Sequence, residues 1–269
     1  MPDSFQIEAI ARASELCEQR LREPVSVAEM ADAACYSLFH FCRVFVLATG
    51  HTPHRYLLRR RLSESAAEVE NSDRNLSEIA FDYCFGAPET YARAFRRVFG
   101  ALPSDWRKSA PHDPRLRLPP FDEPFLRHLH ERVTFHMEPP AVPACLFGLM
   151  TPAVDDETPL HLRRRLRELT ATAAVWGARI FPPDWPRRPW LYFAGVETPP
   201  EWPHAVLDIP ACAWSAATHI GGLTLVPRTL DCLRFVRQAN TLPTRAPQMT
   251  LELIVAETTT VLTPVSNQR

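Results

Sequence analysis

A repeat of about fifty residues limits the folds open to the first part of this chain more than any other feature. Glu29-Met-Ala31 recurs as Glu78-Ile-Ala80, and Cys35 recurs 49 positions later as Cys84. After one inserted residue the offset becomes 50, and it relates Arg43 to Arg93, Phe45 to Phe95, Gly50 to Gly100, Pro53 to Pro103 and Tyr56 to Trp106. Self-similarity on this scale predicts one structural unit used twice.

Each copy of the repeat predicts a short helix, a tight turn and a second helix. The expected helices cover 27–34 and 38–49 in the first copy, and 77–83 and 88–99 in the second. Gly50 and Gly100 stand where the second helices end, and Pro88 suits the first position of its helix. Two helices joined in this way at about a right angle form a helix-turn-helix unit, whose second helix can enter a major groove of DNA.

A further helix over 54–70 is expected to join the two copies. At about 1.5 Å per residue it is roughly 25 Å long. That length suits two groove-reading helices one DNA turn apart, about 34 Å. We therefore expect one chain to hold two successive major grooves, without a need for a palindromic site.

Two stretches resemble the AraC/XylS family of transcription regulators. They read VSVAEMADAACYSLFHFCRVFVLATGHTPHRYLLRRRL and LSEIAFDYCFGAPETYARAFRRVFGALPSDWRKS, and the resemblance covers roughly residues 5–108. It implies binding to double-stranded promoter DNA, with RNA polymerase as a further partner, and leaves activator and repressor both open. The family usually has glycine in each turn, where this chain has Cys35 and Cys84. Those cysteines either adopt a strained positive φ or mark slightly different turns.

The same resemblance assigns positions that face the groove. They are Phe39, Cys42 and Arg43 in the first copy and Glu89, Thr90 and Arg93 in the second. Arginine can donate two bonds to a guanine edge, glutamate can accept from a cytosine amino group, and aromatic or methyl groups can touch a thymine methyl. Although a surface arginine is ordinarily just solvated, the matching placement of Arg43 and Arg93 after each turn favours DNA contact.

Basic residues elsewhere in this part are candidates for phosphate contacts, which set register without reading sequence. We expect this role for Arg59, Arg97 and Lys108, within clusters that also hold Arg55, Arg60, Arg61, Arg96 and Arg107. An ordinary solvated face is the alternative for many of them, since Glu64, Glu68 and Glu70 follow closely. Helical spacing assigns Phe41, Phe45, Phe95 and Phe99 to the core.

The segment 109–120 holds four prolines in twelve residues and predicts a stiff, extended linker. It separates an all-α domain, 1–108, from an α+β domain, 121–269. In the second domain short β-rich runs at 132–137, 144–150, 190–196, 205–209, 213–219 and 249–256 alternate with helical stretches near 158–176 and 227–239.

A second repeat lies in the α+β part. Val142-Pro-Ala-Cys145 recurs as Ile209-Pro-Ala-Cys212. It predicts a duplicated β-α-β-β arrangement that forms one sheet with a groove between its halves. With IPACAWSAATHIGG and the late strand MTLELIV, this part resembles the GyrI-like effector-binding domain. The resemblance implies a small-molecule effector.

Glu252 is the residue singled out in this part. It stands in the middle of an alternating strand, where a carboxylate is expensive to bury without a partner. The resemblance implies that it lies in a ligand groove that favours cationic, aromatic molecules. Four aromatic residues could supply stacking walls: Trp190, Tyr192, Trp202 and Trp214. The alternative is that Glu252 pairs with an arginine and that the tryptophans belong to the core.

Several function classes find no support in the sequence. It shows no glycine-rich phosphate loop, nucleophile elbow or zinc-ligand spacing, so we expect no enzyme, no cofactor and no metal. A hydrolase or drug-sequestering second domain and a thiol sensor at Cys35 and Cys84 stay open as alternatives.

Three features of the sequence predict a cytoplasmic protein without a membrane partner. Its seven cysteines form no C-x-x-C pair, its N-terminus lacks a basic and then apolar signal segment, and no apolar run is long enough to span a bilayer. Net charge is −1, so nucleic-acid binding would depend on where the basic residues lie.

Overall fold

The computed structural model describes residues 1–136, 138–153, 155, 157–170, 172, 174–221, 223–238, 248–255 and 258–264. These residues divide into two compact units. The first contains Met1–Glu131, and the second contains Arg132–Phe235 together with the strands near the C-terminus.

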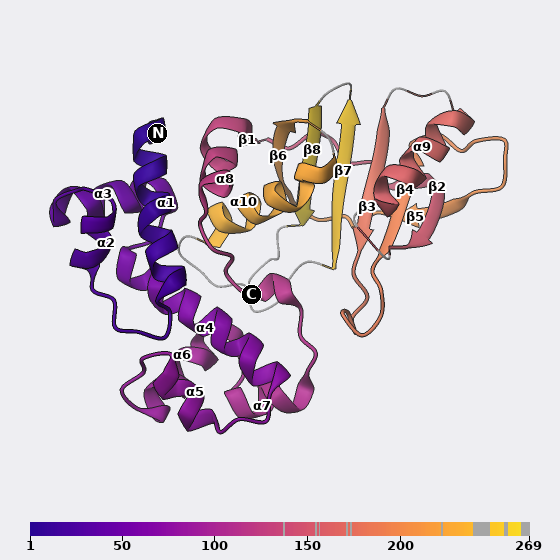
Figure 1. Cartoon of the computed structure of the whole chain (residues 1–269). Helices are drawn as coiled ribbons and strands as arrows, with labels where there is room; N and C mark the ends of the chain where they lie inside the picture. The colour runs from indigo at the N-terminus through magenta and orange to yellow at the C-terminus, as the bar shows by residue number, and fades with distance from the viewer. Residues whose placement is uncertain are drawn as a thin grey trace. The chain divides into compact units, whose positions relative to one another are not determined.

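The first unit is helical, as the sequence predicts. Its helices are α1 (Ser4–Gln19), α2 (Val27–Ala33), α3 (Leu38–Thr49), α4 (Pro53–Asn71), α5 (Leu76–Asp82), α6 (Pro88–Phe99), α7 (Pro103–Ser109) and α8 (Glu123–Arg127), with a short 3₁₀ helix η1 (Pro114–Leu116) and a short π-helix η2 (His128–Arg132). The helix α4 runs between the group α1–α3 and the group α5–α7 (Figure 1). It is the joining helix that the repeat predicts.

Each copy of the repeat has its own aromatic core. In the first, Phe45 lies 5.4 Å from Phe41 and 5.6 Å from Tyr56, measured between ring centroids. In the second, Phe95 lies 5.7 Å from Trp106. Tyr56 and Trp106, related by the repeat, therefore close equivalent cores. The prediction that Phe41, Phe45, Phe95 and Phe99 are core residues is confirmed, because all four are buried.

The proline-rich segment 109–120 contacts the helical unit. The Leu118 backbone N–H donates to Ser63 Oγ at 2.9 Å, and its carbonyl accepts from Arg60. Next to the segment, the ring of Phe121 is fully buried and stacks on Tyr56 at 4.7 Å. Because these contacts bind the segment to α4, the division between the units falls after Glu131 rather than within 109–120.

The second unit is built on one antiparallel sheet. Its strands are β1 (Val133–His136), β2 (Cys145–Pro152), β3 (Val175–Ile180), β4 (Leu191–Val196), β5 (Ala205–Asp208), β6 (Trp214–Ile220), β7 (Met249–Val255) and β8 (Thr258–Pro264), with α9 (Thr158–Thr170), η3 (Leu223–Leu225) and α10 (Val226–Gln238). The sequence missed β3 and β8. It was wrong to extend the first helix to 176, because α9 ends at Thr170 and β3 begins at Val175.

The order of the strands across the sheet shows a twofold relation between its halves. The order is β1-β6-β8-β7-β3-β4-β2-β5. The chain runs β1-β2-α9-β3-β4 and then β5-β6-α10-β7-β8, so each strand of the first half corresponds to the strand four numbers later. Exchanging every strand with its counterpart gives the same order across the sheet, read from the other edge. Each half also contributes its first strand to the edge of the other: β1 pairs with β6, and β5 with β2. The predicted duplication of β-α-β-β is present as an order of elements.

Both helices of this unit cover the same face of the sheet (Figure 1). On that face, Leu166 of α9 packs near Val175, and Leu230 of α10 packs near Ile254; Val175 and Ile254 are register partners. The opposite face carries a separate core around Trp176, Phe193 and Leu262, joined by Val142 and Ile209. The second repeat thus serves packing, because it places Val142 and Ile209 on the face without helices.

Candidate nucleic-acid interface

The first helix-turn-helix unit is made by α2 and α3. A capping box of Ser26 and Glu29 starts α2, and the Ser37 side chain caps α3. Between the helices Cys35 adopts a left-handed φ of 58°. Among the described residues no single helix is long and apolar enough to cross a membrane; α2 and α3 together reach that length and composition, but the chain bends by 82° between them. That bend is the near-right angle expected of this motif.

The second unit repeats the first down to its backbone hydrogen bonds. Tyr36 N–H donates to Ala31 at 3.0 Å, and Phe85 N–H donates to Ala80 at 2.9 Å. Cys84 has a φ of 62°, close to that of Cys35. The sequence left open whether these cysteines adopt a strained positive φ or mark slightly different turns, and the structure has the strained positive φ. Gly50 and Gly100 end α3 and α6 in the left-handed conformation, as predicted.

The residues expected to read bases project from the second helix of each unit. In α3, Phe39 is 74% exposed, and the Arg43 guanidinium lies over its ring, with Cζ 5.8 Å from the centroid. Arg43 is exposed, whereas Cys42 is half-buried. In α6 the corresponding side chains of Glu89, Thr90 and Arg93 are all accessible to solvent. Arg43 and Arg93 therefore occupy equivalent, accessible positions.

The basic residues split into two classes that the sequence did not separate. Arg97 and Lys108 are exposed and available to phosphate. Arg60 instead binds Glu18 and Glu64 at 2.6 and 2.8 Å. Two others hold backbone carbonyls: Arg61 those of Leu21 and Glu23, and Arg107 those of Val69 and Arg74. These three arginines fasten helices together.

The prediction that Arg59 contacts phosphate is wrong in this structure, because its side chain is only 4% exposed. Its Nη1 lies 3.5 Å from His51 Nε2, and its Nε has no hydrogen-bond partner among the described residues. Burial, with the nearby charge of Arg55, lowers the pKa of Arg59 to about 10. Burial also lowers the pKa of His51. Since His51 Nδ1 lies 2.7 Å from the Thr49 carbonyl, the neutral ring donates there and accepts from Arg59.

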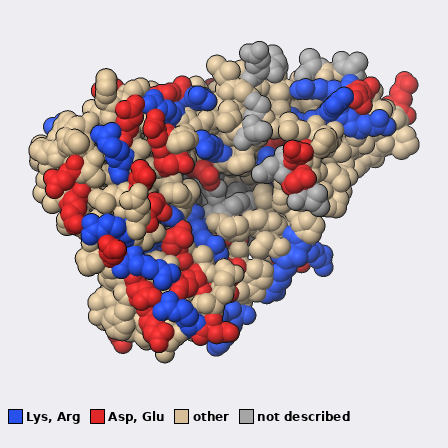
Figure 2. All heavy atoms as spheres, in the orientation of Figure 1, with Lys and Arg blue, Asp and Glu red and all other residues tan. Residues whose placement is uncertain are grey.

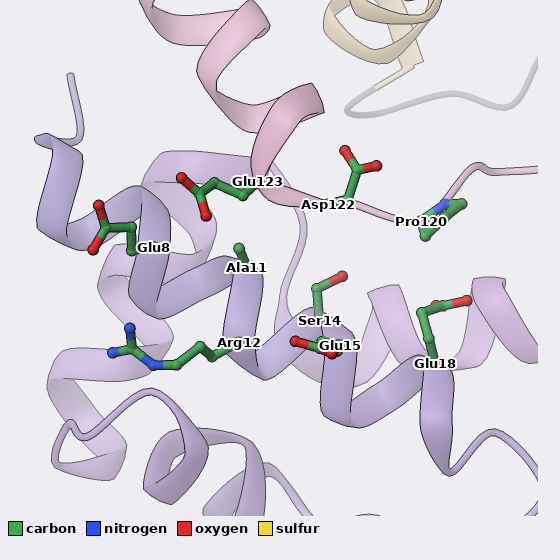
Figure 3. A pocket seen from close by; sticks show the side chains of 9 residues that line it. All are labelled: Glu8, Ala11, Arg12, Ser14, Glu15, Glu18, Pro120, Asp122 and Glu123. Carbon is green, nitrogen blue, oxygen red and sulfur yellow. The ribbon is translucent and has the colours of Figure 1, made fainter.

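A pocket of about 530 Å³ lies between α1 and the start of α8 (Figure 3). It is lined by Glu8, Ala11, Arg12, Ser14, Glu15, Glu18, Pro120, Asp122 and Glu123. Arg127 pairs with two of the acids, Glu8 and Glu123, at 2.8 and 2.6 Å, and offsets part of their charge. The remaining negative charge would repel phosphates, so we expect DNA to approach another side of the unit. On the face drawn in Figure 2, acidic and basic side chains are interleaved and form no continuous basic stripe among the described residues.

In the second unit Glu252 is fully buried and already paired. Its Oε1 accepts from Arg179 Nε at 2.5 Å, and its Oε2 accepts from Arg163 Nη2 and from the Tyr192 hydroxyl, both at 2.9 Å. Burial alone would raise the pKa of the Glu252 carboxyl, but Arg179 and Arg163 outweigh burial and lower it. The structure therefore has the alternative in which Glu252 pairs with arginine.

Backbone geometry makes room for this cluster. Gly177 lies opposite Glu252 in the register of β3 and β7. A Cβ at this position would clash with Arg163 Nη2 and with the Tyr192 hydroxyl. Arg163 comes from α9 and also binds the Val175 carbonyl at 3.0 Å. The cluster thus joins α9 to three strands.

The aromatic candidates separate by burial. Tyr192 and Trp214 belong to the cores, with exposures of 0% and 8%. Trp190 and Trp202 are partly buried beside the α9 core, and the Arg179 guanidinium lies over the Trp190 ring at 5.0 Å. Only Trp190 and Trp202 of the four remain accessible enough to meet a ligand.

Comparisons with known proteins identify relatives of the first unit. A helix-turn-helix domain family matches residues 30–109. The chain is 36% identical over 112 residues to "Transcriptional regulator Rob" of Salmonella typhimurium, covering 40% of this chain and 39% of that protein. It is 31% identical over 93 residues to "Regulatory protein SoxS" of the same organism, covering 35% of this chain and 87% of SoxS. Among solved structures, the DNA-binding domain of AdpA in complex with a target DNA is 30% identical, with a TM-score of 0.34, covering 39% of this chain and 90% of that one.

The chain spans about two fifths of the length of Rob. It spans most of SoxS, however. The helix-turn-helix family match at 30–109 covers the second unit completely and the first unit from within α2 onward. The two turns, the two aromatic cores and the extent of the match to SoxS all indicate the same tandem helix-turn-helix family. Through its first unit, the chain belongs to the AraC family of helix-turn-helix proteins.

Proposed function

We propose that the protein is a sequence-specific DNA-binding transcription regulator whose first unit grips two successive major grooves of a promoter. The observation that carries the proposal is the equivalence of Arg43 and Arg93, which are accessible at the same position of two units with matching backbone geometry. The similarity to the transcriptional regulator Rob and to the regulatory protein SoxS supports the regulatory role.

Roles follow for the accessible side chains. Arg43 and Arg93 donate to guanine edges, Glu89 accepts from a cytosine amino group, and Phe39 and Thr90 touch thymine methyl groups. Cys42, half-buried, borders this surface. Arg97 and Lys108 bind phosphates and hold the register. RNA polymerase is the expected protein partner at the promoter.

We propose that the second unit is a GyrI-like module that binds a small-molecule effector and biases the DNA-bound state. The duplicated β-α-β-β order and the two partly buried tryptophans, Trp190 and Trp202, support this. Glu252 is not open to a cation here, because its carboxylate already accepts from two arginines and a tyrosine. The effector that suits this arrangement is therefore an aromatic molecule that stacks on the tryptophans.

The test is anisotropy of labelled duplexes titrated with the full chain. Arg93→Ala should weaken a selected site by roughly 5- to 150-fold, corresponding to the loss of one bidentate base contact of about 1–3 kcal/mol, and should weaken random duplex much less. Arg164→Ala, at a side chain of α9 that is 83% exposed, is the matched control and should change neither. Equal weakening of selected and random DNA would make Arg93 a phosphate clamp and refute the base-reading role.

A further inference from the structure

The repeat relates residues of α3 to residues of α6 at an offset of 50, and the exposed pairs differ in chemistry. Where α6 presents Arg96 and Arg97, α3 presents Val46 and Leu47. The two arginines are exposed, and the two apolar side chains are 43% and 53% exposed. The same helical positions thus carry two positive charges in one unit and none in the other.

The first turn of each helix differs in the same way. Phe39, 74% exposed, corresponds to Glu89, and the neighbouring Leu38 is 50% exposed. Arg43 is the only Lys, Arg, Asp or Glu in α3, and its guanidinium rests over the Phe39 ring. The outer face of α3 therefore carries mainly apolar side chains around one arginine, with His40 also exposed, while that of α6 is charged.

We propose that the two units read unequal half-sites: α3 lies on a thymine-rich segment and touches its methyl groups, while α6 lies on a guanine-containing segment and supplies most of the phosphate charge. This inference rests on the proposed DNA binding. Thymine is the one base whose major-groove edge carries a methyl group, so an apolar helix face that enters that groove gains most from thymine. Counterion release scales with the number of phosphates neutralised, so it should arise mainly under α6.

The first experiment uses a random duplex library selected on the full chain, followed by replacement of thymine by deoxyuridine in one half-site at a time. Each buried methyl group removed under α3 should weaken binding about three- to fivefold, since one apolar carbon contributes about 0.8 kcal/mol. Replacement under α6 should cost less in total, because Thr90 is the one side chain there that is expected to touch a thymine methyl group. The half-site under α3 is identified by Phe39→Ala, which should reduce the difference between thymine and deoxyuridine there and leave it unchanged under α6.

The second experiment measures the slope of log K against log salt. Arg96→Val with Arg97→Leu should make the slope shallower by up to about 1.8, or about 0.9 for each phosphate that is no longer neutralised. Val46→Arg with Leu47→Arg should make it steeper. The matched control is Arg164→Val with Arg165→Leu on α9, whose side chains are 83% and 66% exposed, and it should leave the slope unchanged.

The outcomes separate this inference from the proposed function. If the library yields no enriched sequence, specific DNA binding itself fails. If a site is enriched but deoxyuridine weakens both halves equally, or the Arg96 and Arg97 variant keeps the full salt slope, the inequality of the two readers is refuted while DNA binding stands.

Discussion

Replacing both turn cysteines by glycine should stabilise the first unit. Cys35 and Cys84 have φ values of 58° and 62°, where the Cβ of an L-residue crowds the following carbonyl at a cost of about 1–2 kcal/mol. Glycine removes that strain but loses about 0.5–1 kcal/mol more conformational entropy on folding. The net gain is about 0.5–1 kcal/mol per site. Because the sites lie in separate turns, the gains should add to about 1–2 kcal/mol.

The assay is calorimetric unfolding of the full chain, with amide exchange in α3 and α6 to assign the transition. The double variant Cys35→Gly with Cys84→Gly should raise the melting temperature of this unit by about 3–8 °C. Cys42→Gly is the matched control, because it makes the same chemical change inside α3 and should destabilise by at least roughly 0.3 kcal/mol, since glycine is a poorer helix former than cysteine. If the turn variants lower stability as the control does, the argument from backbone strain is refuted.

Two further predictions concern buried ionisable groups. Glu252→Ala leaves Arg163 and Arg179, 3% and 6% exposed, without their carboxylate, and should lower the free energy of unfolding of the second unit by about 3–5 kcal/mol in chemical denaturation. The control Glu168→Ala, at a side chain that is 53% exposed, should lower it by under about 0.5 kcal/mol. Equal losses would contradict the structural role of Glu252. The lowered pKa of His51, due first to burial, means that the unfolded chain binds more protons between the folded pKa and about 6.5. The stability that His51 contributes to the first unit should be complete above about pH 6.5 and fall as pH drops through the folded pKa. His51→Gln should flatten this part of the profile in amide exchange of α4, and an unchanged profile would count against the assignment.

Much of the first unit could be predicted because its information is local and repeated. The spacing of Phe45, Gly50 and Tyr56 recurs with Phe95, Gly100 and Trp106, and each set forms an equivalent core and helix end. The fates of the arginines could not be predicted in this way. Arg60 and Arg59 are neighbours on one helix, and both are buried. Leu118, 58 residues away, binds Arg60, whereas His51 lies against Arg59.

The second unit shows the same limit more strongly. Glu252 was identified as expensive to bury, but its partner Arg163 lies 89 residues away on a helix whose sequence resembles an ordinary polar surface helix. The strand β3 follows that helix so closely that periodicity merged the two. Gly177 could not be identified from its local sequence either. Glycine is required there because the side chains of Arg163 and Tyr192 occupy the space that a Cβ would fill.

The most direct test of the central claim is missing-base interference on a selected duplex bound by one molecule of the full chain. Two helix-turn-helix units joined by α4 predict two clusters of essential bases about 10 base pairs apart in a 1:1 complex. Arg43→Ala should erase one cluster, and Arg93→Ala should erase the other. A single cluster, or clusters that require two protein molecules, would contradict a tandem reader.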